Sequence, residues 1–200
     1  MTLIDTPSTA HELAALIGSG AEIIDGAVHV ASLVGGSRTS GSAEPEERTS
    51  PGSRETRFVN DSFDADDTDA AIRSVRRGFD DGAWGRMSAR DRSRVLWRAS
   101  ELVAAAADRL AELLVVEAGK PVRDSRGEVG ALVNSLEYYA GLARGIGGRT
   151  ENDVQPGMLA MTLREPAGVA GLIVPWNFPI GILAQKLPPA LAAGNTVVIK

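Results

Sequence analysis

The chain has 200 residues, enough for one domain of ordinary size, and its 26 acidic and 21 basic side chains give a net charge of −5. A mildly acidic balance argues against a nucleic-acid-binding protein, because nucleic acids select clustered basic surface. Cysteine is absent, which excludes disulfides, thiolate metal sites and a cysteine nucleophile from these residues. The two histidines, His11 and His29, stand alone, so the sequence predicts no metal site.

The first 60 residues read as an N-terminal arm that is partly low in complexity. Residues 1–20 lack the basic start of a signal peptide, and no apolar run reaches the roughly 18 residues of a membrane span. We therefore expect neither a leader nor a membrane segment, and a cytoplasmic location. Residues 23–34 suit one or two short strands, whereas 35–57 contain one alanine and no larger aliphatic or aromatic residue. That composition predicts a mobile loop or a pair of poorly packed surface strands.

Helices are predicted from residue 61 to residue 149. Asp64 or Asp66 can cap a first helix that ends near Gly82. The S-x-x-D pattern at Ser88 resembles a capping box and opens a long helix over residues 88–119, which a glycine ends.

A third helix is predicted over about 122–142. Its buried stripe consists of Val129, Leu132, Val133, Leu136 and Tyr139. The glycine-rich stretch 145–150 follows this helix and leads toward a strand pair at 150–164. A phosphate-binding loop needs a strand before it and a helix after it, so this stretch fits a helix stop better.

The last 33 residues have the pattern of a parallel strand–helix–strand unit. Residues 168–174 form an apolar run of strand length, 180–191 are helical, and 195–200 form a second buried strand. Gly194 is placed just past the helix end, in the position where a left-handed residue turns the chain. In open parallel sheets, ligands bind beyond the carboxyl ends of the strands, which here means residues 175–179 and Lys200.

The sequence of the connecting loop, PWNFP at 175–179, is unusual enough to carry chemistry. Asn177 is a neutral double donor, stiffened by Trp176, Phe178 and the flanking prolines, and such a group suits hydrogen bonding to a developing oxyanion. Lys200 is a flexible donor for ribose hydroxyls or phosphate. A purely structural alternative stays open, in which PWNFP is a stiff aromatic-packed turn and Lys200 a solvated strand end.

Together, PWNFP and the strand ending in VIK resemble the most specific motifs of the aldehyde dehydrogenase superfamily. The likeness covers about 66–200 and is weak before that, since 50–55 reads SPGSRE where the family usually has N-P-A-T-G-E. Further matching motifs are Ala83-Trp84 with 88–92, EAGKP at 117–121, EYYAG at 137–141 and REPAGV at 164–169.

The resemblance implies an α/β fold, namely the N-terminal part of a Rossmann-like NAD(P)-binding domain with an incomplete sheet. It implies NAD or NADP as cofactor and oxidation of an aldehyde to a carboxylate through a thiohemiacetal. Asn177 matches the family's oxyanion-hole side chain, and Lys200 the lysine that holds the adenine ribose. Lys186 matches a lysine near the active site, or is a plain surface lysine. The cofactor-lining loop corresponds to Ile173, Val174, Pro175, Trp176 and Asn177.

The family mechanism needs a cysteine thiolate and a glutamate that activates water, and this chain has no cysteine. We therefore expect an N-terminal portion, truncated before the catalytic domain and inactive alone. The alternative is a non-catalytic interaction protein that pairs with a full-length relative. The family suggests a homo-dimer or tetramer. The expected parts are the arm 1–60, helices 61–149, a strand pair 150–165 as an oligomerisation arm, and the first βαβ unit 166–200.

Overall fold

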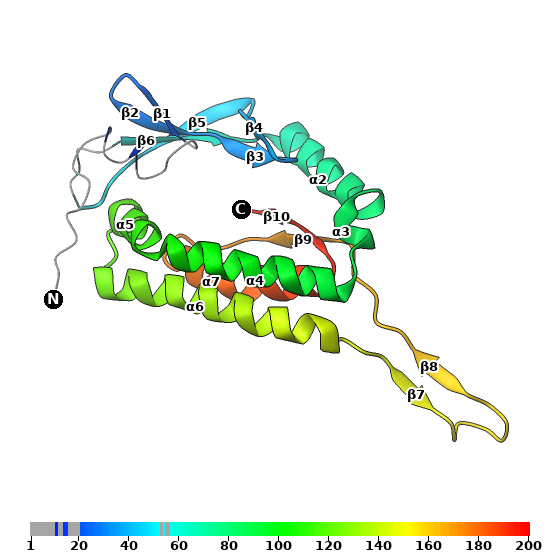
Figure 1. The fold of residues 1–200 in the computed structure, drawn as a ribbon. Helices are drawn as coiled ribbons and strands as arrows, with labels where there is room; N and C mark the ends of the chain where they lie inside the picture. Colours follow the sequence, from blue (N-terminus) through cyan, green and yellow to red (C-terminus); the bar gives the residue numbers. More distant parts are fainter. Residues whose placement is uncertain (1–10, 12–13, 16–20, 53, 55–56) are drawn as a thin grey trace.

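The computed structural model describes residues 11, 14–15, 21–52, 54 and 57–200. Figure 1 shows two layers, with the N-terminal strands and one helix on one side and the remaining long helices on the other. Two C-terminal strands lie between these layers, and a thin hairpin projects away from the body. Residues 1–10, on which the prediction of no signal peptide depends, lie outside the described residues.

The N-terminal layer is a mixed four-stranded sheet of order β1-β2-β6-β5, in which only β2 and β6 are parallel. A short antiparallel pair, β3 and β4, lies beside it. The strands are β1 (Ala21–Ile24), β2 (Ala27–Val30), β3 (Ser32–Val34), β4 (Ser37–Thr39), β5 (Ala43–Thr49) and β6 (Arg57–Ser62).

Three strands fall within 21–34, where one or two were expected. Asp25 and Gly26 have φ angles of 50° and 74°, so the chain turns in the left-handed region directly after β1. For 35–57, the alternative of poorly packed surface strands is the correct one, because β4 is fully exposed and β5 is exposed at every position after Ala43.

The first helix, α2 (Ala65–Asp80), begins as predicted. The Asp64 carboxylate accepts from the Asp67 amide at 2.9 Å, and the Asp67 carboxylate accepts from the Asp64 amide at 3.3 Å, which makes a reciprocal capping box. One turn of helix, α3 (Ala83–Arg86), follows.

The prediction of one long helix over 88–119 is wrong in one respect. The structure divides this stretch into two helices, α4 (Ala89–Ala105) and α5 (Ala107–Ala118). The break is at Ala106, with φ −100° and ψ 10°. A run of alanines carries no local signal for a break. Packing explains it: α4 contributes Leu96 to the cluster formed with α6 and α7, whereas α5 sends Val116 to the N-terminal sheet.

The third helix, α6 (Val122–Leu142), has the predicted bounds and the predicted stripe, and Val129, Leu132 and Leu136 are buried. A 3-10 turn, η1 (Ala143–Gly145), ends it and leads into the hairpin of β7 (Arg149–Glu151) and β8 (Ala160–Thr162). The glycine-rich stretch is therefore a helix stop, as expected.

The C-terminal unit is β9 (Val169–Leu172), α7 (Pro179–Ala192) and β10 (Thr196–Ile199), and its two strands are parallel. The βαβ prediction is confirmed, and the chain has the α/β architecture of a partial Rossmann-like domain. Gly194 turns the chain with φ 92°, and a β-carbon there would lie 2.9 Å from Cγ of Pro166. No helix within the described ranges is long and apolar enough to cross a membrane.

Buried polar side chains fix this unit against the helices. Pro188 lacks an N–H, so the carbonyl of Ala184 loses its helical partner, and the Ser135 hydroxyl of α6 donates to it at 2.5 Å. Asn195 is buried, accepts from the Gly168 amide at 3.0 Å and donates to the Ala190 carbonyl at 3.0 Å. The Asn195 bonds fix the starts of β9 and β10, and thereby hold the two strands in register up to their carboxyl ends.

Candidate functional site

The carboxyl ends of β9 and β10 lie side by side, as the parallel pairing requires. Beyond the strands, the Lys200 amide donates to the Leu172 carbonyl at 2.9 Å, and the Val174 amide donates to the Lys200 carbonyl at 2.7 Å. The Lys200 side chain is exposed at this edge. The predicted cofactor residues Ile173, Val174 and Lys200 are therefore brought together, at the place where parallel sheets bind ligands.

The side chains of the connecting loop are turned outward. Trp176 is 77% exposed and Phe178 is half exposed. Asn177 is exposed, and its side chain makes no hydrogen bond to any described residue, so both amide donors are available. Aromatic packing around Asn177, which the sequence suggested as the source of stiffness, is therefore not what holds the loop.

Lys186, on α7, holds the start of the loop. Its ammonium donates to the Ile173 carbonyl at 2.6 Å, directly after β9. Although the side chain is exposed, this contact gives it a defined position. The structure thus places Lys186 beside the loop rather than on a free helix face.

Lys120, in the turn between α5 and α6, holds the far end of the loop. Its ammonium donates to the Asn177 carbonyl at 2.6 Å and lies 3.8 Å from the centroid of the Phe178 ring. It also pairs with the Glu128 carboxylate of α6, and the two side chains are only 10% and 6% exposed. Such a desolvated pair is stable only when further hydrogen bonds satisfy its charges, as they do here.

Glu128 provides the second of those bonds. Its other oxygen accepts from the Gly181 amide at 2.8 Å, in the first turn of α7. Phe178 precedes that helix and supplies no side-chain cap, so a carboxylate from a different helix satisfies this amide. Sequence reasoning missed this pair. The available signal was a charged residue beside Val129 on the apolar face of the predicted helix.

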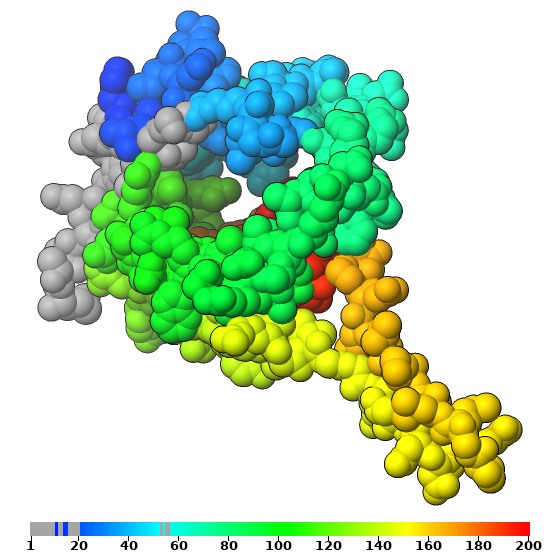
Figure 2. All heavy atoms as spheres, turned by 45° about the vertical axis from the view of Figure 1, so that its right-hand side comes forward, coloured from blue at the N-terminus to red at the C-terminus, as the bar shows by residue number. Residues whose placement is uncertain are grey.

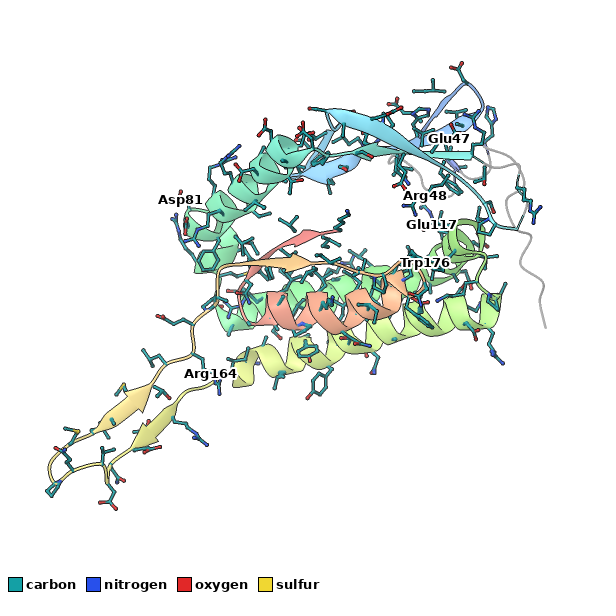
Figure 3. The ribbon with its side chains drawn as sticks, turned by 180° about the vertical axis from the view of Figure 1, so that it is seen from behind. Glu47, Arg48, Asp81, Glu117, Arg164 and Trp176 are labelled. Carbon is teal, nitrogen blue, oxygen red and sulfur yellow. The ribbon has the colours of Figure 1, made fainter. Side chains whose placement is uncertain are left out.

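A cavity of about 800 Å³ lies between α5 and the N-terminal sheet, and Trp176 of the connecting loop forms part of its wall. Figure 3 shows Trp176 beside Glu117, with Arg48 and Glu47 across the gap, and Figure 2 shows the hollow between these layers. Glu117 is open to solvent on one side, and its partial burial against the cavity wall raises its pKa, an effect that the nearby Arg48 partly offsets.

The geometry fits a dinucleotide at the strand ends, with one restriction. The amide-rich N-terminus of a helix after a first parallel strand commonly binds phosphate. Here the Glu128 carboxylate already occupies the Gly181 amide of α7, which leaves no room for a second anion at that group. Among the residues at this edge, Lys200 is then the exposed cation suited to ribose or phosphate.

Comparisons with known proteins agree on one family. The family model described as "Aldehyde dehydrogenase family" matches residues 38–200. Aldehyde dehydrogenase family 2 member B4, mitochondrial, of Arabidopsis thaliana is 44% identical over 141 residues, which cover 68% of this chain and 26% of the relative. The chain thus spans about a quarter of the length of that curated relative.

Solved structures give the same result. An NAD-dependent aldehyde dehydrogenase from Sinorhizobium meliloti superposes with a TM-score of 0.81 at 36% identity, covering 86% of this chain and 35% of the other. An NADP-dependent enzyme from E. coli gives a TM-score of 0.78 at 31% identity, with 84% and 34% covered. With its sequence motifs, its fold and the family model in agreement, the chain belongs to the aldehyde dehydrogenase family.

Proposed function

We propose that this chain supplies the cofactor wall and the oxyanion donor of an NAD(P)-dependent aldehyde dehydrogenase, which converts an aldehyde to a carboxylate in the complete enzyme. One observation carries the proposal. Asn177 presents an unpartnered side-chain amide beside the carboxyl ends of two parallel strands, with its backbone held by Lys120. A fixed donor of this kind stabilises charge as it develops on a carbonyl oxygen.

The surrounding residues divide the remaining tasks. Ile173, Val174, Pro175 and Trp176 form the wall against which the cofactor lies, and Lys200 reaches its ribose. When bound, the cofactor supplies a hydride acceptor. Lys186 keeps the start of the loop in place through the Ile173 carbonyl. The cofactor is NAD or NADP, since relatives named for each share this fold at 36% and 31% identity.

The chain alone is inactive in this proposal, because the 200 residues contain no cysteine to attack the aldehyde. The substrate-attacking thiol belongs to the complete enzyme. We also propose a cytoplasmic location for this chain, in contrast to the Arabidopsis relative, which is named as mitochondrial.

Two measurements on the purified chain test this function. Titration with NAD and NADP, followed by isothermal calorimetry, should show binding that Lys200→Met weakens about tenfold, while Arg149→Met in the distant hairpin has no effect. Mixed with an aldehyde and either cofactor, the chain should form no reduced cofactor. Turnover would contradict the proposed inactivity, and equal binding by wild type and Lys200→Met would contradict the role of Lys200.

A second candidate function is supported by the hairpin of β7 and β8. It projects from the body (Figure 1), and Leu159, Met161 and Leu163 on it are more than half exposed. Exposed apolar side chains on an isolated strand pair favour pairing with another chain. In this alternative the chain is a non-catalytic partner of a full-length relative, and residues 150–165 are its oligomerisation arm. Co-purification at fixed stoichiometry with such a relative, lost on deletion of 152–159, would support it. A monodisperse monomer in its presence would contradict it.

A further inference from the structure

We infer that the Lys120–Glu128 ion pair positions Asn177, so that these two residues are positioning residues of the proposed reaction. The inference rests on the proposed function, in which Asn177 is an oxyanion donor and must therefore keep a fixed position. Neither residue touches the exposed side-chain amide of Asn177, and their contacts are with the backbone at Asn177 and at Gly181 after it.

The pair holds the chain at two points, one at the residue that carries the donor and one in the first turn of α7. Lys120 fixes the Asn177 carbonyl at 2.6 Å, and Glu128 fixes the Gly181 amide at 2.8 Å, four residues later. Between these points lie Phe178, whose ring faces the Lys120 ammonium at 3.8 Å, and Pro179, whose φ is restricted by its ring. Little backbone freedom is left at the residue that carries the donor.

The burial of the pair explains why it is suited to this task. Exposed ion pairs exchange partners with water and hold geometry poorly, whereas this pair is almost fully desolvated. Two hydrogen-bonded charges inside the protein therefore have one favourable arrangement, which the loop must follow. Glu128 is on α6, which is packed through Val129 and Leu132 into the core, so the reference point itself is rigid.

Lys186 makes the arrangement complete by holding the Ile173 carbonyl at the other end of the loop. Two lysines thus fix the backbone at both ends of 173–177, while the side chains of Trp176 and Asn177 stay free. This separation of a held backbone from a free side chain is what a preorganised donor requires.

The test measures the position of Asn177 directly, without cofactor, in the full 200-residue chain. Removing one charge leaves the other buried and risks unfolding, so the main variant is the double substitution Lys120→Met with Glu128→Met. It removes both charges and the acceptor of the Gly181 amide at similar side-chain volume. NMR follows the side-chain amide resonances of Asn177 and the hydrogen exchange of the Gly181 amide, and urea denaturation follows global stability. Lys120→Arg is the conservative variant, and Asp124→Asn, which breaks the exposed pair with Arg123 on the same helix, is the matched control.

We expect the double variant to remain folded, to accelerate exchange at Gly181 by about fivefold or more, and to shift and average the Asn177 side-chain resonances. Lys120→Arg should preserve both signals, and Asp124→Asn should leave them unchanged. The inference is overturned if the Asn177 resonances of the double variant match those of the wild type, or if exchange accelerates equally throughout α4 and α6, which would indicate a structural role alone. NAD(P) titration of the same samples tests the proposed function separately. A chain in which Asn177 is ordered but no cofactor binds would contradict the proposed function and leave the positioning role of the ion pair intact.

Discussion

The N-terminal sheet and the C-terminal βαβ unit hold their strands by different means. In the βαβ unit, individual backbone groups are fixed by hydrogen bonds to buried polar side chains, Asn195 within the unit and Glu128 from α6. In the N-terminal sheet, the charged pairs of β5, Glu46–Arg48 and Glu47–Arg57, are about half exposed. Exposed pairs contribute little to stability.

The sheet is instead attached through a small apolar contact. Val28, Phe58 and Val116 form its cluster, and the buried Ser50 hydroxyl donates to the Val116 carbonyl at 2.7 Å. The difference indicates that backbone positions are held most tightly beside the candidate site. The N-terminal sheet, by contrast, is joined to α5 by this local cluster and the Ser50 hydrogen bond. Four substitutions test this contrast.

The largest effect is expected for Leu136→Ala in the helical core. Leu136 is 3% exposed within the cluster shared by α4, α6 and α7. Truncation should lower the free energy of unfolding by about 2–5 kcal/mol, because it removes buried methyl groups and leaves a cavity. Urea denaturation measures the change. Leu142→Ala, on the same helix but 43% exposed, should change it by less than about 1 kcal/mol. Equal effects would mean that the core is not where we place it.

Val28→Ala should weaken the N-terminal sheet selectively. Val28 is fully buried against Phe58 and Val116, and its truncation should cost about 2 kcal/mol. Hydrogen exchange should accelerate in β1, β2 and β6 while α6 and β9 keep their protection, because the contact with α5 is local. Ile24→Ala, at an exposed position of β1, is the control. Uniform acceleration across both regions would show that they unfold as one unit and would remove the contrast.

Ser50→Ala should have a smaller effect of the same kind. It deletes the hydroxyl that bonds the Val116 carbonyl and should cost about 1 kcal/mol, again seen by exchange in the sheet. Ser37→Ala on the exposed β4 serves for comparison. If both substitutions change hydrogen exchange in the sheet equally, the Ser50 hydrogen bond does not contribute, and the sheet is attached by apolar contacts only.

The smallest effect is expected for Glu117→Gln at the cavity, and it depends on pH. Burial raises the folded-state pKa of Glu117 above its unfolded value of about 4.3, so the folded state binds the proton more tightly. This stabilisation is fully present below pH 4.3 or so and is lost as pH rises through the folded pKa. Because Glu117 stays open to solvent on one side, screening keeps the effect small. Relative to wild type, the variant should therefore gain at most about 2 °C in melting temperature at pH 7, and the gain should vanish near pH 4. A difference that is independent of pH would contradict the assigned cause.

Sequence reasoning was most successful where a pattern is local. The helix cap at Asp64, the stripe of α6, the left-handed turn at Gly194 and the βαβ unit all appear as expected. Each depends on residues within one or two turns of one another, so periodicity and capping chemistry suffice. The family motifs likewise identified the loop at 175–179 and its neighbour Lys200.

It was less successful where distant segments meet. The break at Ala106 has no local cause and exists because α4 and α5 have different packing partners. The sequence assigns the stiffness of the loop to Trp176, Phe178 and the flanking prolines. In the structure the two rings are exposed, and Lys120 and Glu128 provide contacts that the sequence does not predict. Those residues are 47 or more positions away from the loop at 175–179, a separation that no local pattern spans.

By itself, then, the sequence determined the α/β class and the family, and it located the candidate residues at the strand ends, because all three depend on contiguous motifs and on hydrophobic periodicity. Tertiary structure alone decided how Asn177 is held. A buried ion pair forms only when two separate elements bring opposite charges together out of water, and here the turn at Lys120 and the helix at Glu128 do so against the loop.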